Sequence, residues 1–173
     1  MVDTKAGAAE FRALFERQYP MLYCYLSRAS GDPALADDIA QEAFVRLYQR
    51  EEVPDDAAAW LVTVATNLLQ DVRRRTARQG RILDRRSAWL VPESPVPSPD
   101  AAVLSGEQVA LVRRALDRLA PREQQLLLLR HEGYSYREIA VALAVAETSV
   151  GTLLIRATAA FRAVFEEARD ASR

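Results

Sequence analysis

The chain has 173 residues, of which 50% are apolar and 27% charged, and its formal net charge is −1. That length suits one large domain or two small ones, and that composition excludes a globally disordered chain. A single cysteine, Cys24, excludes an internal disulfide and points to a reducing compartment, the cytoplasm. No apolar run is long enough for an export signal or a membrane span, so we expect neither.

Apolar residues recur every three or four positions along the chain, and no convincing stretch alternates apolar and polar residues. This period is typical of amphipathic helices, so the sequence predicts an all-α fold. One helix is expected to begin near Glu10 and a second at Pro20. Further helices are expected over residues 34–50, 57–78, 101–119, 122–132, 135–143 and 148–167.

Residues 91–100 read VPESPVPSPD, with four prolines in ten positions. So many prolines are incompatible with the interior of a helix or a sheet, so this segment is predicted to be an extended linker. The sequence therefore predicts two small helical domains, residues 1–79 and 104–173, joined by a proline-rich linker over residues 80–103.

The third predicted helix carries an apolar stripe and, beside it, an acidic face. Such a face is usually only solvated. Three of its residues are carboxylates, but no histidine joins them, and we expect no metal site there. The acidic face consists of Asp37, Asp38, Gln41 and Glu42.

The fourth predicted helix carries a polar stripe that leads into an arginine cluster, Arg73 to Arg75. Arginine suits phosphate because it is permanently charged and forms bidentate hydrogen bonds. Residues 32–56 hold eight acids and two arginines, whereas residues 71–86 hold seven arginines and two acids. This reversal suggests two surfaces for two kinds of partner. Trp60 is expected either to stack on an unpaired base or to lie in the core.

The C-terminal domain shows the pattern of two short helices that cross over a tight turn. Ser135 and Glu138 fit a capping box at the start of the first helix. Ala144 occupies the turn position that usually holds glycine. The pattern predicts a helix-turn-helix, whose second helix would enter the major groove, although an ordinary helical hairpin is the alternative. The residues expected to face the groove are Thr148, Ser149, Thr152 and Arg156.

Three blocks of the sequence carry a family resemblance: GDPALADDIAQEAFVRLYQ, AWLVTVATNLLQDVRRR and LAPREQQLLLLRHEGYSYREIA. In this order, with a variable linker before the third, they resemble the extracytoplasmic-function (ECF) sigma factors of bacterial RNA polymerase, in the sigma-70 family. The resemblance covers nearly all of residues 11–167. It implies promoter recognition and transcription initiation, with core polymerase, promoter DNA and an anti-sigma factor as partners.

The resemblance also implies residue roles. The acidic face, Asp37, Asp38, Gln41 and Glu42, would dock on the clamp helices of the largest polymerase subunit. The fourth helix would read the melted −10 element, and the loop over residues 51–56 would line a pocket for an extruded base. Asn67 would touch bases there, and Arg73, Arg74, Arg75 and Arg78 would hold the DNA backbone. The last helix would read the −35 element through Thr148, Ser149, Thr152 and Arg156.

The sequence departs from the family at one place, because many relatives carry basic residues where this chain has Gly151 and Leu153. We therefore expect the isolated C-terminal domain to bind DNA weakly. With one histidine, His131, and one cysteine, Cys24, we expect no catalytic site, no cofactor and no enzymatic activity. Two other functions remain open: a stand-alone helix-turn-helix regulator, and a sigma-like protein that acts only by binding other proteins.

Overall fold

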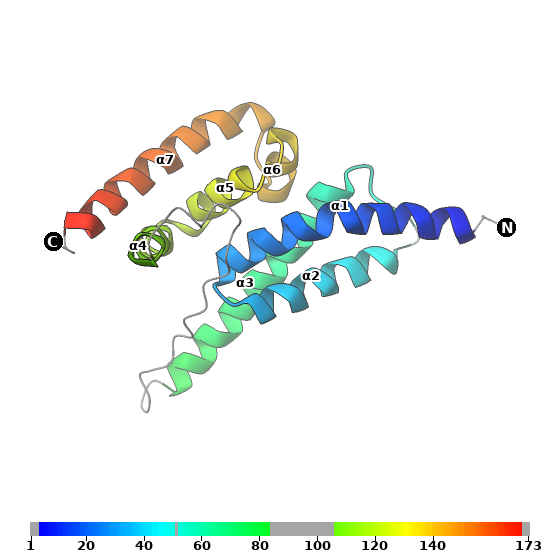
Figure 1. Cartoon of the computed structure of the whole chain (residues 1–173), viewed down its shortest axis with the longest axis horizontal. Coiled ribbons are helices and arrows are strands. Elements are labelled where there is room, and N and C mark those ends of the chain that lie inside the picture. Colours follow the sequence, from blue (N-terminus) through cyan, green and yellow to red (C-terminus); the bar gives the residue numbers. More distant parts are fainter. Residues whose placement is uncertain (1–3, 51, 84–105, 171–173) are drawn as a thin grey trace. The chain divides into compact units, whose positions relative to one another are not determined.

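The computed structural model describes residues 4–50, 52–83 and 106–170, and every regular element within these ranges is an α-helix (Figure 1). This confirms the predicted all-α fold. The chain divides into two compact units, Met1–Ser94 and Pro95–Arg173. Most of the predicted linker lies outside the described residues, and the predicted domain limits remain predictions. The helices are α1 (Thr4–Ser30), α2 (Pro33–Tyr48), α3 (Ala57–Leu83), α4 (Gly106–Asp117), α5 (Pro121–His131), α6 (Tyr136–Leu143) and α7 (Glu147–Asp170).

The N-terminal unit is a three-helix bundle in which α1, α2 and α3 all pack against one another (Figure 1). Its core combines large side chains with alanines, which allow the helices to approach closely. Leu22, Leu26, Leu47 and Leu61 are fully or almost fully buried, and each contributes about 1.5–3 kcal/mol through burial. Tyr25 is also fully buried, and its hydroxyl lies 3.0 Å from the Thr66 hydroxyl, which satisfies both polar groups.

The prediction that a second helix begins at Pro20 is wrong, because α1 continues through this residue to Ser30. An internal proline removes one backbone hydrogen bond and crowds the preceding turn. The aromatic rings of Phe15 and Tyr19 compensate for that cost, since they contact Phe44 of α2 at centroid distances of 4.9 and 5.9 Å. Leu22, just beyond the proline, is buried in the same core. Tertiary packing on both sides of Pro20 therefore keeps the helix continuous.

The C-terminal unit is built around α7, which packs against α4, α5 and α6 (Figure 1). Leu126, Leu129, Ile139, Val150 and Ala157 form the centre of its core. The observed limits of α5, α6 and α7 lie within three residues of the predicted ones. In the N-terminal unit, by contrast, α3 extends to Leu83, five residues beyond the predicted end of that helix.

The predicted capping box is present at the start of α6. The Ser135 hydroxyl accepts a hydrogen bond from the Glu138 backbone N–H at 3.2 Å, and the Glu138 carboxylate accepts one from the Ser135 N–H at 2.6 Å. Ala144 ends α6 in the left-handed conformation, with φ 51°. The turn therefore has the backbone shape for which glycine is usually chosen, built with an alanine.

None of the described helices is by itself long and apolar enough to cross a bilayer. Together α6 and α7 reach the required length and composition, but they are bent by 88° at the turn between them.

Candidate functional site

The acidic face lies on α2, on the side turned away from the core. Asp32 caps the start of this helix, because its carboxylate accepts hydrogen bonds from the N–H groups of Ala34 and Leu35 at 3.0 and 3.2 Å. Buried residues on the other side of α2 hold it against α1 and α3. The acidic face therefore stands on a helix that is fixed at its start and along its length. Asp38, Gln41 and Glu42 are exposed and Asp37 is half-buried.

The four residues of the acidic face have different surroundings. Both carboxylate oxygens of Asp37 accept hydrogen bonds, one from the Tyr19 hydroxyl and one from the Gln41 amide at 2.9 Å. Burial, with the hydrogen bond to Asp37 and its charge, raises the pKa of Tyr19 to about 12. Glu42 pairs with Arg46 at 2.7 Å. Asp38 makes no hydrogen bond or ion pair within the described ranges, so it is the most available carboxylate of the face.

Two exposed apolar residues continue this face toward the end of α2, and the sequence analysis did not select them. Val45 is 47% exposed and Tyr48 is 71% exposed. They follow Asp38 and Gln41 at helical spacing, a signal that was available in the sequence. The tyrosine ring is held against Phe11 of α1, with centroids 5.2 Å apart. The exposed side of α2 thus combines charge with apolar contact area.

The predicted DNA-contacting residues of α3 fall into two groups. Asn67, Arg74 and Arg78 follow one another at helical spacing and are exposed, and Arg75 is exposed beside them. Arg73 points elsewhere, because its guanidinium donates a hydrogen bond to the Ala29 carbonyl near the end of α1. A cation at that position also suits the helix dipole of α1. The structure therefore gives Arg73 a contact with another helix, whereas Arg74 pairs within α3 with Asp71 at 3.4 Å.

Trp60, at the start of α3, is half-buried and belongs neither to the core nor to an open surface. The guanidinium of Arg50 lies 5.3 Å from the centroid of its ring, a cation–π distance. Arg50 in turn donates a hydrogen bond to the Glu52 carbonyl at 3.2 Å, which ties it to the loop before α3. One face of the indole is thus covered by a side chain. Glu51, the first residue of the predicted base pocket, lies outside the described residues.

The four predicted groove-facing residues, Thr148, Ser149, Thr152 and Arg156, are all exposed on α7. They lie away from the side of α7 that buries Val150 and Ala157. Arg156 has no ion pair in the part of the chain that the structure describes. Ile155, which was not predicted to contact DNA, shares this outer side and is 73% exposed.

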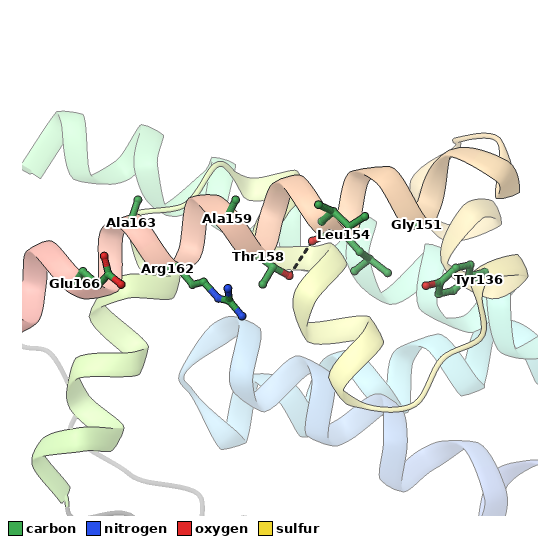
Figure 2. Close-up of a pocket in the computed structure, with 9 residues that line it drawn as sticks. Tyr136, Gly151, Leu154, Thr158, Ala159, Arg162, Ala163 and Glu166 are labelled. Atoms are coloured by element: carbon green, nitrogen blue, oxygen red, sulfur yellow. Dashed lines mark hydrogen bonds between the residues drawn. The ribbon is translucent and has the colours of Figure 1, made fainter.

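A surface cavity of about 740 Å³ runs along the same helix (Figure 2). One wall comes from Tyr136 at the start of α6, and the rest comes from α7. The α7 residues that line it are Gly151, Leu154, Ile155, Thr158, Ala159, Arg162, Ala163 and Glu166.

The described residues contain no group of three His, Cys, Asp or Glu side chains that could hold a metal ion. The two residues considered for catalysis also lie apart in sequence and environment. Cys24 is half-buried on α1, and His131 is exposed at the end of α5.

The family comparisons match both units. Residues 14–79 match the model of sigma-70 region 2, and residues 110–160 match that of sigma-70 region 4. The chain is 34% identical to the ECF RNA polymerase sigma factor SigL of Mycobacterium tuberculosis, over 94% of this chain and 92% of that protein. It is 30% identical to the ferric citrate uptake sigma factor FecI of Escherichia coli, over 89% and 90% of the two chains.

Among solved structures, the fold matches that of the sigma factor RpoE from Bartonella quintana, crystallised with the anti-sigma factor NepR. The TM-score is 0.69 at 18% identity, and the match covers 91% of this chain and 97% of the other. Both helical units described above therefore have counterparts in one known fold.

Proposed function

Because the chain belongs to the ECF RNA polymerase sigma factors of the sigma-70 family, we propose a division of its work between the two units. The domain over residues 1–79 binds core RNA polymerase and the −10 element. The domain over residues 104–173 binds the −35 element, and residues 80–103 connect the two. The protein acts in the cytoplasm by binding and not by catalysis, since the polymerase supplies the chemistry of RNA synthesis.

The exposed side of α2 docks on the polymerase. The observation that supports this most directly is that Asp38 and Glu42 are exposed on a firmly packed helix and neither supports the core. Gln41 belongs to the same contact, and Asp37 holds the Gln41 amide in place through its 2.9 Å hydrogen bond. A basic partner surface suits these carboxylates, and Val45 and Tyr48 add apolar area beside them.

The exposed side of α3 holds the −10 element. Arg74, Arg75 and Arg78 neutralise phosphates, and Asn67 contacts a base. Arg73 supports this surface indirectly. Its guanidinium donates a hydrogen bond to the Ala29 carbonyl and so holds the end of α1 against α3. The loop over residues 51–56 receives an extruded base. Contacts to that base offset the few kcal/mol that unstacking costs, by order of magnitude.

The outer side of α7 reads the −35 element through Thr148, Ser149, Thr152 and Arg156. Their exposure at the start of the second helix of a capped helix-turn-helix supports this role. An anti-sigma factor is the remaining expected partner, since the matching RpoE fold was crystallised with one.

The test is transcription in vitro with the full chain, core polymerase and a promoter library randomised at −10 and −35. We expect transcripts from a subset of promoters that share both elements and depend on the added chain. A matched pair of variants tests the docking surface: Asp38→Lys should weaken co-purification with core, whereas Glu16→Lys, at an exposed position of α1, should not. Promoter-independent output, or core binding unaffected by Asp38→Lys, would contradict the proposal.

A further inference from the structure

Gly151 is a residue of α7 that the fold itself does not require. Glycine inside a helix costs about 1 kcal/mol relative to alanine. Gly151 is not among the described glycines with positive φ, which are Gly31 and Gly133. A Cβ built on Gly151 would approach the Cε2 atom of Tyr136 at 3.7 Å, which is ordinary van der Waals contact. Neither the backbone conformation nor the packing therefore explains the missing side chain.

Ile155 lies one helical turn further along the same side of α7. At 73% exposure it is the most exposed of the large apolar residues in the described part of the chain. A single exposed isoleucine is ordinary on a protein surface. Here, however, it borders the space left by Gly151, and both residues line the surface cavity.

Tyr136 forms the opposite wall of this space. Figure 2 shows its ring facing α7 beside Gly151, with Leu154 on the next turn. The guanidinium of Arg130, on α5, lies 5.5 Å from the centroid of the Tyr136 ring. This cation–π contact restrains the orientation of the ring. The end of the surface cavity between Tyr136, Gly151 and Ile155 has mainly apolar walls, whereas Thr158, Arg162 and Glu166 line the cavity further along α7. We call this end the Gly151 hollow.

The Gly151 hollow lies among the residues assigned to the major groove. Gly151 directly precedes Thr152, and Ile155 directly precedes Arg156. On the major-groove edges of DNA, the 5-methyl group of thymine is the one apolar group that distinguishes a base pair. An apolar hollow at the start of a recognition helix is complementary to that methyl group. Its apolar walls themselves offer no partner for a phosphate or for the hydrogen-bonding edge of guanine.

We propose that the Gly151 hollow receives the methyl group of a thymine in the −35 element, which makes Gly151, Ile155 and Tyr136 determinants of promoter specificity. This inference rests on the proposed function of α7. It also accounts for the departure from the family at Gly151, because a helix that reads a methyl group needs space at this position instead of a positive charge.

The test uses a promoter selected by the holoenzyme. Each thymidine of its −35 element is replaced in turn by deoxyuridine, which lacks only the methyl group. Binding of the holoenzyme to each duplex is then measured. We expect at least one replacement to weaken binding about fourfold, which corresponds to the free energy gained by burying one methyl group. Ile155→Ala should bind the thymine promoter more weakly than wild type and should show no further loss with deoxyuridine.

Gly151→Ala provides a second variant that should fold at least as well as wild type, because alanine favours the helix. Its added methyl group fills the hollow from the protein side. We expect it to weaken binding to the thymine promoter and to remove the difference between thymine and deoxyuridine. Val141→Ala, at an exposed apolar residue of α6, is the control and should keep the wild-type difference.

Four outcomes would overturn the inference. If no deoxyuridine replacement weakens binding, or if Ile155→Ala loses as much with deoxyuridine as wild type does, the hollow reads no methyl group. If both variants weaken binding equally on thymine and deoxyuridine DNA, the hollow contacts something other than the base, such as a protein. A holoenzyme that selects no −35 sequence at all would overturn the −35 assignment as well, which separates failure of the proposed function from failure of this inference.

Discussion

Helices α3 and α7 each bury one side and expose the other, yet their exposed sides differ sharply in charge. Between Asn67 and Arg78, α3 exposes four arginines and one aspartate. Over the first ten residues of α7, the charged residues are Glu147 and Arg156 alone. Of these two helices, α3 therefore has the stronger attraction for phosphate. The start of α7 offers mainly hydroxyl groups and apolar surface, and its apolar contacts can be made only with the bases.

This difference suggests how a weakly charged reading helix contributes to binding. Once the N-terminal unit is held on the polymerase, the linker keeps the C-terminal unit near the DNA at a high effective concentration. A contact that is weak in isolation then adds to the affinity and to the selection of promoters. On the proposed function, α3 would then supply most of the phosphate contacts, and α7 would add base contacts at −35 to those made at −10.

The largest expected effect belongs to the docking face of the N-terminal unit. Changing Asp38 and Glu42 together to lysine places like charges against a basic surface, which costs several kcal/mol. We expect core binding by the full chain to fall by more than about a hundredfold, measured by co-purification or titration with core polymerase. The variant should unfold at the wild-type temperature, because both positions are exposed.

The matched control for the docking variant is Glu10 and Glu16 changed together to lysine. These residues lie on α1, are exposed and produce the same change in net charge. Wild-type core binding by the docking variant, or an equal loss by the control, would show that α2 is not the specific contact.

The next effect concerns the arginines of α3. Alanine at Arg74, Arg75 and Arg78 should weaken promoter binding by the holoenzyme and flatten its salt dependence, by about one unit of slope for each lost phosphate contact. Arg73→Ala serves as the internal comparison. Because its guanidinium bonds to the Ala29 carbonyl, we expect Arg73→Ala to cost about 1 kcal/mol of stability and to leave the salt slope unchanged.

If Arg73→Ala also lowers the salt slope by about one unit, this arginine gives up its bond to α1 and binds a phosphate instead. If the slope of the triple variant matches that of wild type, the α3 arginines make no phosphate contacts, and the contrast between the two units disappears.

A smaller effect is expected in the C-terminal unit. Arg156→Ala should weaken transcription from promoters with an intact −35 element by about tenfold, within the 1–3 kcal/mol of one good base contact. Promoters with a scrambled −35 element should respond little. Footprinting of the holoenzyme tests whether Arg156 contacts the −35 element. Unchanged −35 protection and promoter preference in Arg156→Ala would show that α7 does not read DNA through this residue.

The smallest expected effect is on the turn between α6 and α7. Ala144 has φ 51°, a conformation that costs alanine more than glycine. Ala144→Gly should stabilise the protein by about 0.5–1 kcal/mol, with promoter preference unchanged, as measured by thermal unfolding and by selection from the promoter library. A loss of stability would show that the flexibility of glycine in the unfolded chain outweighs the relieved strain.

Much of the fold was predictable because it depends on neighbours in the sequence. The apolar period located the helices, and the capping box at Ser135 and Glu138 involves residues three positions apart. The tight turn at Ala144 was likewise expected from the local pattern, although its left-handed conformation is known only from the structure. Pro20 is the exception, since its local signal was outweighed by packing of Phe15 and Tyr19 against α2.

The sequence by itself determined which helices carry acids and which carry arginines, and its three motif blocks indicated the family. Only the tertiary structure distinguished residues within those sets. Asp37 is held by Tyr19, 18 residues away, while Asp38 is available, and Arg73 reaches Ala29, 44 residues away, while Arg74 does not. The Gly151 hollow likewise needs Tyr136 from the preceding helix. Periodicity shows which side of a helix a residue occupies, but the partner on that side comes from a distant part of the chain.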